Sequence, residues 1–417
     1  MSILNWFGKK GIEVHEASDE YQLKNIGNIV IPEKLTSKNA YLLANSVAEI
    51  YFPVDFYADR ISKLRFIIVN KSGKEVLSSD LNRLISNEIN PYFSFSDLIY
   101  NYVFSLLSDG NAINYLGVPS IYKTVSPATI ERWDVLQPNL VEISENYNFS
   151  LLLSNSLNQA IRKAYYLQGG LNRQDINPEN LSIHNFGLKR KSNSIVLAEG
   201  ALWKANKSID TLLAVYSARY NVYANNGAAG YLAHKATTNT NSDLEAVISG
   251  ANKREQILKD INERHGITGR RNLWGISGIP IEFVKTLATI SELMPFEEVL
   301  DDAIKIASVF QIPPVLVPRK DQSTFDNQQG AEKNVWENGL MSMAGTVCQN
   351  LTKMFGITGG NSIGFDSSNV SALTENESLK EDLNGKKLAN IEKMKVLNPE
   401  LDIIPLLTEI FNGYGKE

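Results

Sequence analysis

Few residues in this sequence have the types and the spacing that chemistry requires. The stretch Gly360-Asn361-Ser362-Ile363-Gly364 matches the Gly-x-Ser-x-Gly nucleophile elbow of hydrolases. That elbow needs a strand before it, a helix after it and a triad histidine later in the chain. Here a long predicted helix precedes the stretch, and no histidine follows His265. We therefore predict a glycine-rich turn that enters a strand, and no catalytic residue at this motif.

The common motifs for phosphate and metal binding are missing from the sequence. There is no Gly-x-x-x-x-Gly-Lys-Ser/Thr loop, no His-Glu-x-x-His pair and no Asp-rich calcium loop. The one cysteine, Cys348, excludes an internal disulfide framework and a Cys-rich zinc or iron–sulfur site. The histidines are scattered, so each is expected to be a packing or surface residue: His15, His184, His234 and His265. We expect no metal site and no cofactor.

Charged clusters are the remaining candidate sites. Four acidic residues share one predicted helix: Glu297, Glu298, Asp301 and Asp302. They could bind a metal or supply a general acid, they could form a solvated helix face, or they could present stacked negative charge if copies of the helix ring a channel. The polar loop that follows contains Arg319 and Lys320, which an ordinary solvated loop could also contain. Basic residues precede the helix: Lys253, Arg254, Arg264, Arg270 and Arg271.

The composition is that of an ordinary globular protein. The 417 residues are 43% hydrophobic and 21% charged, and the length predicts about two to four structural units. With 41 Lys and Arg against 46 Asp and Glu, the net charge of −5 excludes a generally basic nucleic-acid coat but allows local basic patches. No uninterrupted apolar stretch of about 18 residues occurs, and the first ten residues lack an apolar signal core. We expect no membrane span, no secretory signal and a reducing cytoplasm.

The first half of the chain alternates helical and β-rich patterns. Apolar spacing predicts a helix over 37–62, a strand over 64–69 and a turn at 71–74. A second helix over 95–108 has Ser94 or Ser96 as its N-cap and ends at Asp109-Gly110. Residues 111–200 form an α+β region with short strands, which we place at 135–140, 149–153 and 163–167.

Three long helices dominate the second half. The first spans 199–224 and ends at Asn225-Asn226-Gly227. The second carries an apolar stripe at Phe296, Val299, Leu300, Ala303, Ile304, Ala307 and Phe310. It begins near Thr289 or at Pro295, and Pro313-Pro314 should end it. The third spans 329–355, with Gly356 just past its end and a stripe at Trp336, Leu340, Met343, Ala344, Val347, Leu351, Met354 and Phe355.

Smaller elements lie between and after these helices. The segment 225–285 has the pattern of an inserted α/β unit, with strands at 230–234, 272–276 and 280–285 around a helix at 243–264. A polar loop covers 317–327, a strand lies near 362–365, and 374–417 is predicted as short charged helices.

This order of parts resembles that of tailed-bacteriophage portal proteins over about residues 37–373. Five short motifs carry the resemblance: Ile306–Leu316, Asp109-Gly110-Asn111-Ala112, Leu181-Ser182-Ile183-His184, Asn226-Gly227 with Gly230-Tyr231-Leu232, and the opening Met1–Lys10. Two segments depart from the family pattern. Glu199-Gly200-Ala201-Leu202 replaces a usual Gly-x-Ser-Pro-Leu helix start, and the C-terminal region lacks a Gly-x-x-Thr-x-Asn-Glu pattern.

The resemblance implies an α+β portal-protein fold in a ring oligomer. Its regions would be an α/β wing at 1–198 and 328–373, stem helices at 199–224 and 286–312, a small α/β clip at 225–285, a tunnel loop at 313–327 and a helical crown at 374–417. The ring, typically of twelve subunits, would occupy one capsid vertex of the virion after assembly in the host cytoplasm. Double-stranded DNA would enter through it during packaging and leave during ejection.

The resemblance also implies partners and site residues. The partners would be the terminase large subunit, a head–tail adaptor and the major capsid protein, with no membrane and no enzymatic activity. Weak DNA contacts would come from Arg319, Lys320, Gln322, Ser323 and Thr324. The acidic helix residues would face the channel or a neighbouring stem, and the basic clip residues would contact neighbouring subunits or the motor. Two alternatives remain open. One is a different ring-forming structural protein, such as a phage adaptor or a secretion channel, and the other is a nucleic-acid-processing enzyme.

Overall fold

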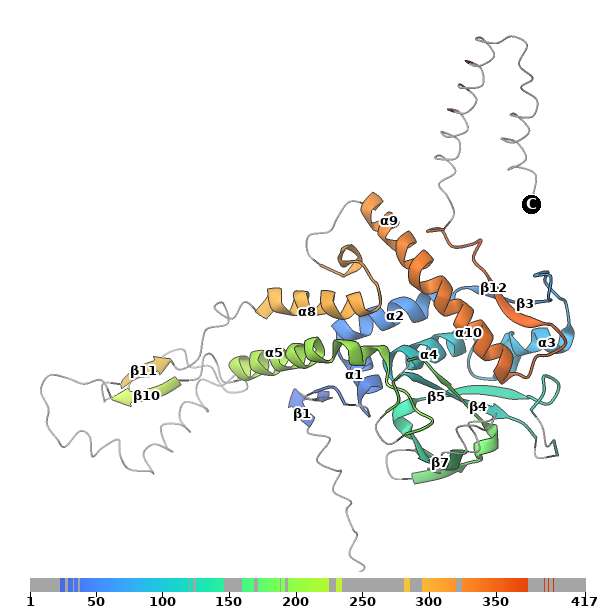
Figure 1. Cartoon of the computed structure of the whole chain (residues 1–417). Coiled ribbons are helices and arrows are strands. Elements are labelled where there is room, and N and C mark those ends of the chain that lie inside the picture. The colour runs from blue at the N-terminus through green and yellow to red at the C-terminus, as the bar shows by residue number, and fades with distance from the viewer. Residues whose placement is uncertain are drawn as a thin grey trace, which may run out of the picture. The chain divides into compact units, whose positions relative to one another are not determined.

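The protein combines long helices with small antiparallel sheets (Figure 1). The computed structural model describes residues 23–26, 29–32, 34–36, 38–119, 121–122, 125–145, 160–168, 172–187, 189–191, 194–224, 230–234, 281–285, 295–319 and 325–373, with Lys386, Ala389 and Lys393 beyond them. The predicted helix at 243–264, the strands at 149–153 and 272–276 and almost all of 374–417 lie outside these residues. None of the described helices is both long enough and apolar enough to cross a membrane.

The chain divides into two compact units. The first comprises 1–58, 101–116 and 134–319, and the second comprises 59–100, 117–133 and 320–417. Helices α2 (Ala48–Ser62) and α4 (Phe95–Ser108) and strand β5 (Arg132–Leu136) contribute residues to both. The first unit also contains α1 (Ala40–Ser46), α5 (Asn206–Ala224), α8 (Pro295–Val309) and these strands: β1 (Leu23–Ile26), β2 (Ile29–Pro32), β6 (Val141–Glu145), β7 (Ile161–Gln168), β8 (Asn172–Ile176), β9 (Leu181–Asn185), β10 (Gly230–His234), β11 (Ile281–Lys285) and nearly all of β4 (Asn111–Gly117).

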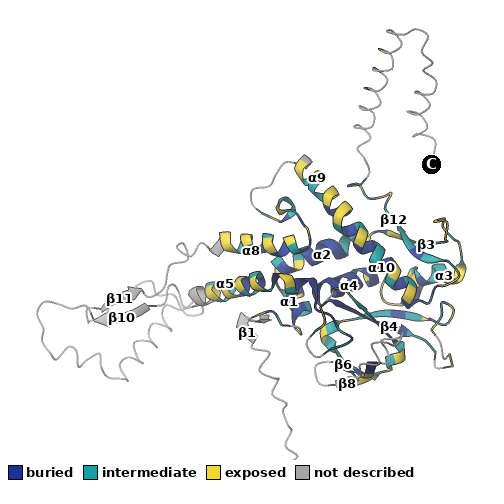
Figure 2. Ribbon diagram, viewed as in Figure 1, coloured by how far each residue is buried: buried dark blue, intermediate teal, exposed yellow. Residues whose placement is uncertain are grey.

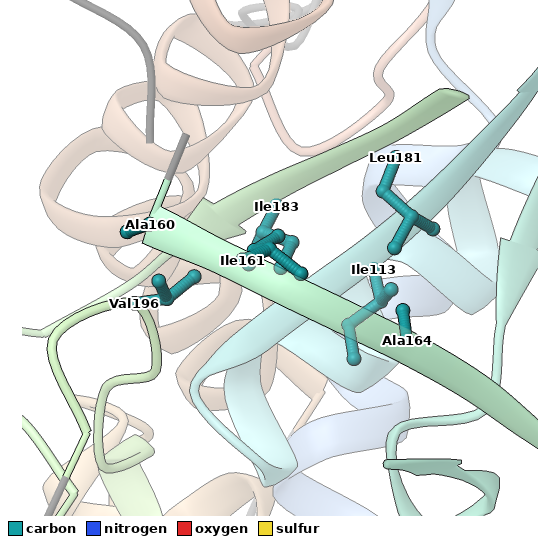
Figure 3. Close-up of a cluster of buried hydrophobic side chains, with 7 residues drawn as sticks. All are labelled: Ile113, Ala160, Ile161, Ala164, Leu181, Ile183 and Val196. Carbon is teal, nitrogen blue, oxygen red and sulfur yellow. The ribbon is translucent and has the colours of Figure 1, made fainter. Parts of the chain in front are cut away.

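Two three-stranded sheets build the core of the first unit, with strand orders β5-β4-β9 and β6-β7-β8. In the first sheet, Ile113 pairs with Ile183, and both side chains are buried. In the second, the register shifts between Ser144 and Glu145, so that β7 has one extra residue. The shift brings Ile161 and Ala164, three positions apart, onto the same buried side. Figure 3 shows the resulting cluster: Ile113, Ala160, Ile161, Ala164, Leu181, Ile183 and Val196.

Helices α5 and α8 lie side by side in the first unit and run in opposite directions (Figure 1). A short 3-10 turn, η7 (Ala201–Ala205), leads into α5, so the predicted helix at 199–224 begins less regularly than expected. Helix α5 buries Ile209, Leu212 and Leu213. Helix α8 buries Ala303, Ile306 and Ala307, and each helix is exposed on its other side (Figure 2).

The second unit is built around a long helix in three segments. These are α9 (Phe325–Val335), a π turn (Trp336–Leu340) and α10 (Met341–Met354), so the helix begins four residues before the predicted start. All eight residues of the predicted stripe are buried. Strands β3 (Arg65–Val69) and β12 (Ser362–Asp366) pair antiparallel, and α3 (Ser79–Leu84) completes the unit. A chain of rings, Phe66–Phe95–Trp133–Phe355, packs with centroid distances of 5.5, 5.8 and 5.5 Å.

Several predicted boundaries are confirmed and others need correction. Ser94 caps α4, because its hydroxyl accepts from the Asp97 amide at 3.1 Å while Asp97 accepts from the Ser94 amide at 3.0 Å. The predicted helix at 37–62 is two helices, because Val47 adopts an extended backbone. A β-branched side chain favours that conformation. The strand predicted at 135–140 lies earlier, at Arg132–Leu136, and Pro138 starts a 3-10 turn after it.

Candidate functional site

The exposed face of α8 carries three of the four predicted acidic residues. Glu297 and Glu298 are exposed, and the Asp301 side chain is 66% exposed. Lys305, one turn further on, places its Nζ 2.7 Å from Asp301 Oδ2. Because three carboxylates stand against Lys305, the face keeps a net negative charge in solvent. An exposed pair of this kind contributes little to stability.

Asp302 does not belong to that face. Its side chain is only 4% exposed, because it lies one turn from the fully buried Ile306 on the same side of α8. Lys305 Nζ is 3.5 Å from Asp302 Oδ1, whereas Oδ2 is buried with no hydrogen-bond donor among the described residues. Burial raises the pKa of this carboxyl. The predicted acidic face therefore consists of Glu297, Glu298 and Asp301.

Helix α8 ends four residues before the predicted Pro313-Pro314 stop. The amide of Gln311 donates to the Ser308 carbonyl at 3.0 Å, and the amide of Ile312 donates to the Ala307 carbonyl at 3.2 Å. These are the two hydrogen bonds of a Schellman motif. The helix therefore ends where the Ser308 and Ala307 carbonyls accept these two hydrogen bonds. The prolines lie after the end of the helix, where Pro314 begins a 3-10 turn. At the other end, the described part of α8 starts at Pro295, and the alternative start near Thr289 lies outside the described residues.

The polar loop after this turn is described only at its start. Arg319 is half-buried, and its Nε is buried without a hydrogen-bond partner in the described part of the chain. The other four predicted loop residues lie outside the described residues: Lys320, Gln322, Ser323 and Thr324. So do the five predicted basic contacts: Lys253, Arg254, Arg264, Arg270 and Arg271. Their roles remain predictions.

A buried polar cluster, called the latch below, holds the segment that leads into α5. It consists of Asp109, Asn111, Lys191 and the Ala198 backbone. Asn111, fully buried, accepts from the Ala198 amide at 2.7 Å and donates to the Ala198 carbonyl at 2.8 Å and to Asp109 Oδ2 at 2.6 Å. Lys191 Nζ lies 2.7 Å from Asp109 Oδ1. A Cβ on Gly110 would lie 2.5 Å from the Gly200 nitrogen, so this approach requires glycine. Asp109-Gly110-Asn111 was noted as a motif in the sequence, but the sequence did not predict its contacts with Ala198 and Gly200.

The hydrolase-like stretch is a turn that enters a strand, as predicted. Gly359 and Gly360 have φ values of 73° and 85°, and strand β12 begins at Ser362. Helix α10 precedes the turn, so the strand–turn–helix geometry of a nucleophile elbow does not occur there. No group of three or more His, Cys, Asp or Glu side chains is placed to hold a metal within the described ranges.

The described residues form a fold of mixed helices and sheets that includes the antiparallel helix pair α5 and α8. The chain belongs to the phage portal protein family, which it matches over residues 48–384. This is a family of structural proteins and not of enzymes.

Solved structures share the fold. The neck of an empty gene transfer agent particle, computed with C6 symmetry, is 14% identical, with a TM-score of 0.54 over 87% of this chain and 93% of the other. The neck of the native particle, computed with C12 symmetry, is 14% identical, with a TM-score of 0.50 over 87% and 91%. A chain of the native particle's virion is 13% identical, with a TM-score of 0.51 over 85% and 89%. No curated protein matches the chain.

Proposed function

We propose that the chain is one subunit of a ring, typically of twelve copies, that forms a DNA channel at one capsid vertex. Double-stranded DNA passes through the ring during packaging and ejection. The observation that carries this proposal is the family match over residues 48–384. The similar fold in a neck with C12 symmetry, from a gene transfer agent particle, supports the ring. A closed ring needs a heterologous contact, in which two different surfaces of each subunit meet.

The proposed regions follow the chain order. The wing comprises 1–198 and 328–373, the stem 199–224 and 286–312, the clip 225–285, the tunnel loop 313–327 and the crown 374–417. The proposed subunit assembles in the host cytoplasm and resides in the virion. Its partners are the terminase large subunit, the head–tail adaptor and the major capsid protein.

The acidic face of α8 suits a passage through which DNA slides. Each phosphate that a protein neutralises releases counterions and adds affinity, so a strongly basic channel would hold DNA and stall it. Glu297, Glu298 and Asp301 instead place negative charge on the exposed side of a proposed stem helix. Arg319 and Lys320 add only a few positive charges in the loop, where weak contacts can form and break.

Charge reversal in the loop tests the proposed DNA contact. Arg319→Glu with Lys320→Glu should lower the amount of DNA packaged per capsid several-fold, because repulsion replaces phosphate attraction. The matched control, Arg319→Lys with Lys320→Arg, keeps the charge and should package like the wild type. Electron microscopy checks that both variants form rings. Equal packaging by the charge-reversed ring would contradict the proposed contact.

The proposed clip has a separate test. Charge reversal at Arg270 and Arg271 should weaken binding of the terminase motor while ring formation stays intact, since clip charges are proposed to contact the motor. Binding of the motor to purified rings measures the effect. Unchanged motor binding at several salt concentrations would remove these two residues from the proposed interface.

A further inference from the structure

The long helix of the second unit carries a stripe of uncharged residues on its exposed side. Helices α9 and α10 and the π turn between them expose these residues at steps of three, four or seven positions: Asn327, Gly330, Asn334, Asn338, Ser342 and Gln349. Residues three or four positions apart lie on one face of a helix, and Gly345 fills the seven-residue step. Asn338 Nδ2 donates to the Asn334 carbonyl at 3.1 Å, so these two amides lie together. We call these seven residues the uncharged stripe.

The residue types of the uncharged stripe do not suit a helix face in water. The solvated face of a helix is normally rich in charged residues, and Asn and Gly are among the poorer helix formers. The fold of the single chain does not require Gly330 or Gly345, because a Cβ at either position would meet no neighbouring atom of the described chain within 4 Å. Such a stripe is expected where a second surface approaches the helix backbone closely.

The charged residues beside the uncharged stripe are paired. Lys333 Nζ lies 3.9 Å from Glu337 Oε1, and Arg60 Nη2 lies 2.9 Å from Glu332 Oε1. The inner side of the same helix is buried, as at Trp336, and Figure 2 shows exposed residues along the outer side of α9. An uncharged centre with a polar, charged rim is the composition of a protein–protein interface, because charged residues are depleted from the core of such interfaces.

The chemistry of the uncharged stripe favours a second copy of this chain over DNA. Attraction to phosphate needs Lys or Arg, and the stripe has neither. An uncharged surface also lets copies with a net charge of −5 meet without like-charge repulsion. At about 1.5 Å per residue and about 10 Å of helix width, the stripe covers roughly 300 Å². That is less than the roughly 800 Å² per partner of a stable pair, so it suits a closed ring, in which each copy is held on two sides.

We propose that the uncharged stripe is a contact surface for a neighbouring copy of this chain. This inference rests on the proposed function, in which copies form a ring. In a rotationally symmetric ring the contact is heterologous, so a different surface of the neighbour covers the stripe. The two glycines let that surface approach the helix backbone, and the amides and the Ser342 hydroxyl form hydrogen bonds across the contact. The other possible occupants are DNA and the segment 374–417 of the same chain.

Thiol labelling of Ser342→Cys measures whether assembly covers the uncharged stripe. The substitution changes one atom. The native Cys348 does not compete for a maleimide, because it is buried and burial raises its pKa to about 12. In DNA-free rings isolated from particles, the introduced thiol should react at least about tenfold more slowly than in the unassembled subunit, because a neighbouring copy excludes the reagent. Ser72→Cys is the matched control, since Ser72 lies exposed in a turn of the same unit and should react equally in both states.

Each of four other labelling results overturns the inference. Equal reactivity of Ser342→Cys in ring and subunit shows an uncovered stripe. Slow reaction already in the unassembled subunit shows that the chain covers the stripe itself, and slow reaction only in DNA-filled rings shows that DNA covers it. Equal slowing in Ser72→Cys shows protection that is not specific to the stripe. All four results leave the proposed ring standing, whereas a chain that forms no ring contradicts the proposed function as well.

A charge variant tests the same contact through assembly, and it applies where Ser342→Cys forms no rings. Asn334→Glu with Ser342→Glu should lower the yield of rings formed beside capsid proteins at least about tenfold, because the contact would bury two unpaired charges. Both substitutions introduce a better helix former, so the subunit should stay folded. Lys74→Glu makes the same change of net charge at an exposed turn position and should assemble like the wild type. A wild-type yield from the double variant overturns the inference.

Discussion

At the scale of single residues, Asp302 shows that two consecutive positions on a helix can face opposite environments. Its neighbour Asp301 is solvated and paired with Lys305, whereas Asp302 is buried and one of its oxygens has no hydrogen-bond partner among the described residues. Removing a carboxylate from water disfavours its charged form, which is why its pKa is raised. Asp302 is therefore a source of instability at neutral pH rather than part of the charged surface of α8.

Asp302→Asn should stabilise the protein by about 1 kcal/mol at pH 7, because an uncharged amide replaces a poorly paired buried charge. A raised pKa in the folded state means that the wild type has its full stability below the ordinary Asp pKa. It loses stability as pH rises through the raised pKa. The difference in free energy of unfolding between variant and wild type should thus grow with pH. Denaturant titrations between pH 4 and pH 8 measure it.

Asp301→Asn is the matched control for this prediction. Its carboxylate is 66% exposed, so its loss should change stability by less than about 0.5 kcal/mol. A destabilised Asp302→Asn protein, or a difference from wild type that stays constant with pH, would contradict the conclusion that burial destabilises this carboxylate.

At the scale of elements, the latch at Asn111 fixes how the chain enters α5. The same side chain satisfies the amide and the carbonyl of Ala198 and also contacts Asp109. Asn111→Ala should therefore cost about 3 kcal/mol, since it leaves several buried polar groups without partners. Gly110→Ala should cost at least as much, because its Cβ would meet the Gly200 backbone and its φ is 91°. Chemical denaturation of each variant measures these costs.

Gly330→Ala is a control for Gly110→Ala, because the same substitution should here raise the free energy of unfolding. It lies exposed in α9, and a Cβ there would meet no atom within 4 Å. Gly330→Ala should stabilise the protein by up to about 1 kcal/mol through helix propensity alone. Latch variants with wild-type stability would mean that the entry to α5 is held by other contacts.

Local patterns predicted the elements that are amphipathic. The apolar stripe of the helix at 329–355 is buried at every predicted position, and the strand at 64–69 and the Ser94 cap are where their residue types place them. The spacing of residue types did not predict contacts between residues that lie far apart in the sequence. The Phe310 carbonyl just after α8 accepts from Tyr57, 253 positions away, and the role of Asn111 depends on Ala198, 87 positions away.

The candidate site was predictable only in part for the same reason. Charge type and helix position identified the acidic residues, and three of the four are exposed. The inward position of Asp302 follows from its i+4 relation to Ile306, a residue that the predicted stripe omitted. The loop and clip residues were inferred from a family resemblance, and their roles depend on contacts with DNA and other subunits that one chain does not contain.

At the scale of the whole molecule, the proposed function requires many copies of the chain to act together around one channel. Under the proposed function, the net charge of −5 and the acidic face of α8 suit a conduit in which DNA slides. A single subunit has no channel, so the charge on α8 gains this meaning only in the ring. The family match supports such an assembly, and direct observation of the assembly tests it.

Electron microscopy of this chain isolated from assembled phage particles tests the claim most directly. Isolation from particles covers the case in which the subunits form rings only beside capsid proteins. We predict a rotationally symmetric ring with an open central channel, present once per particle at a single vertex. A chain recovered from particles as a monomer, as a closed oligomer without a channel, or in copies at every vertex would contradict it.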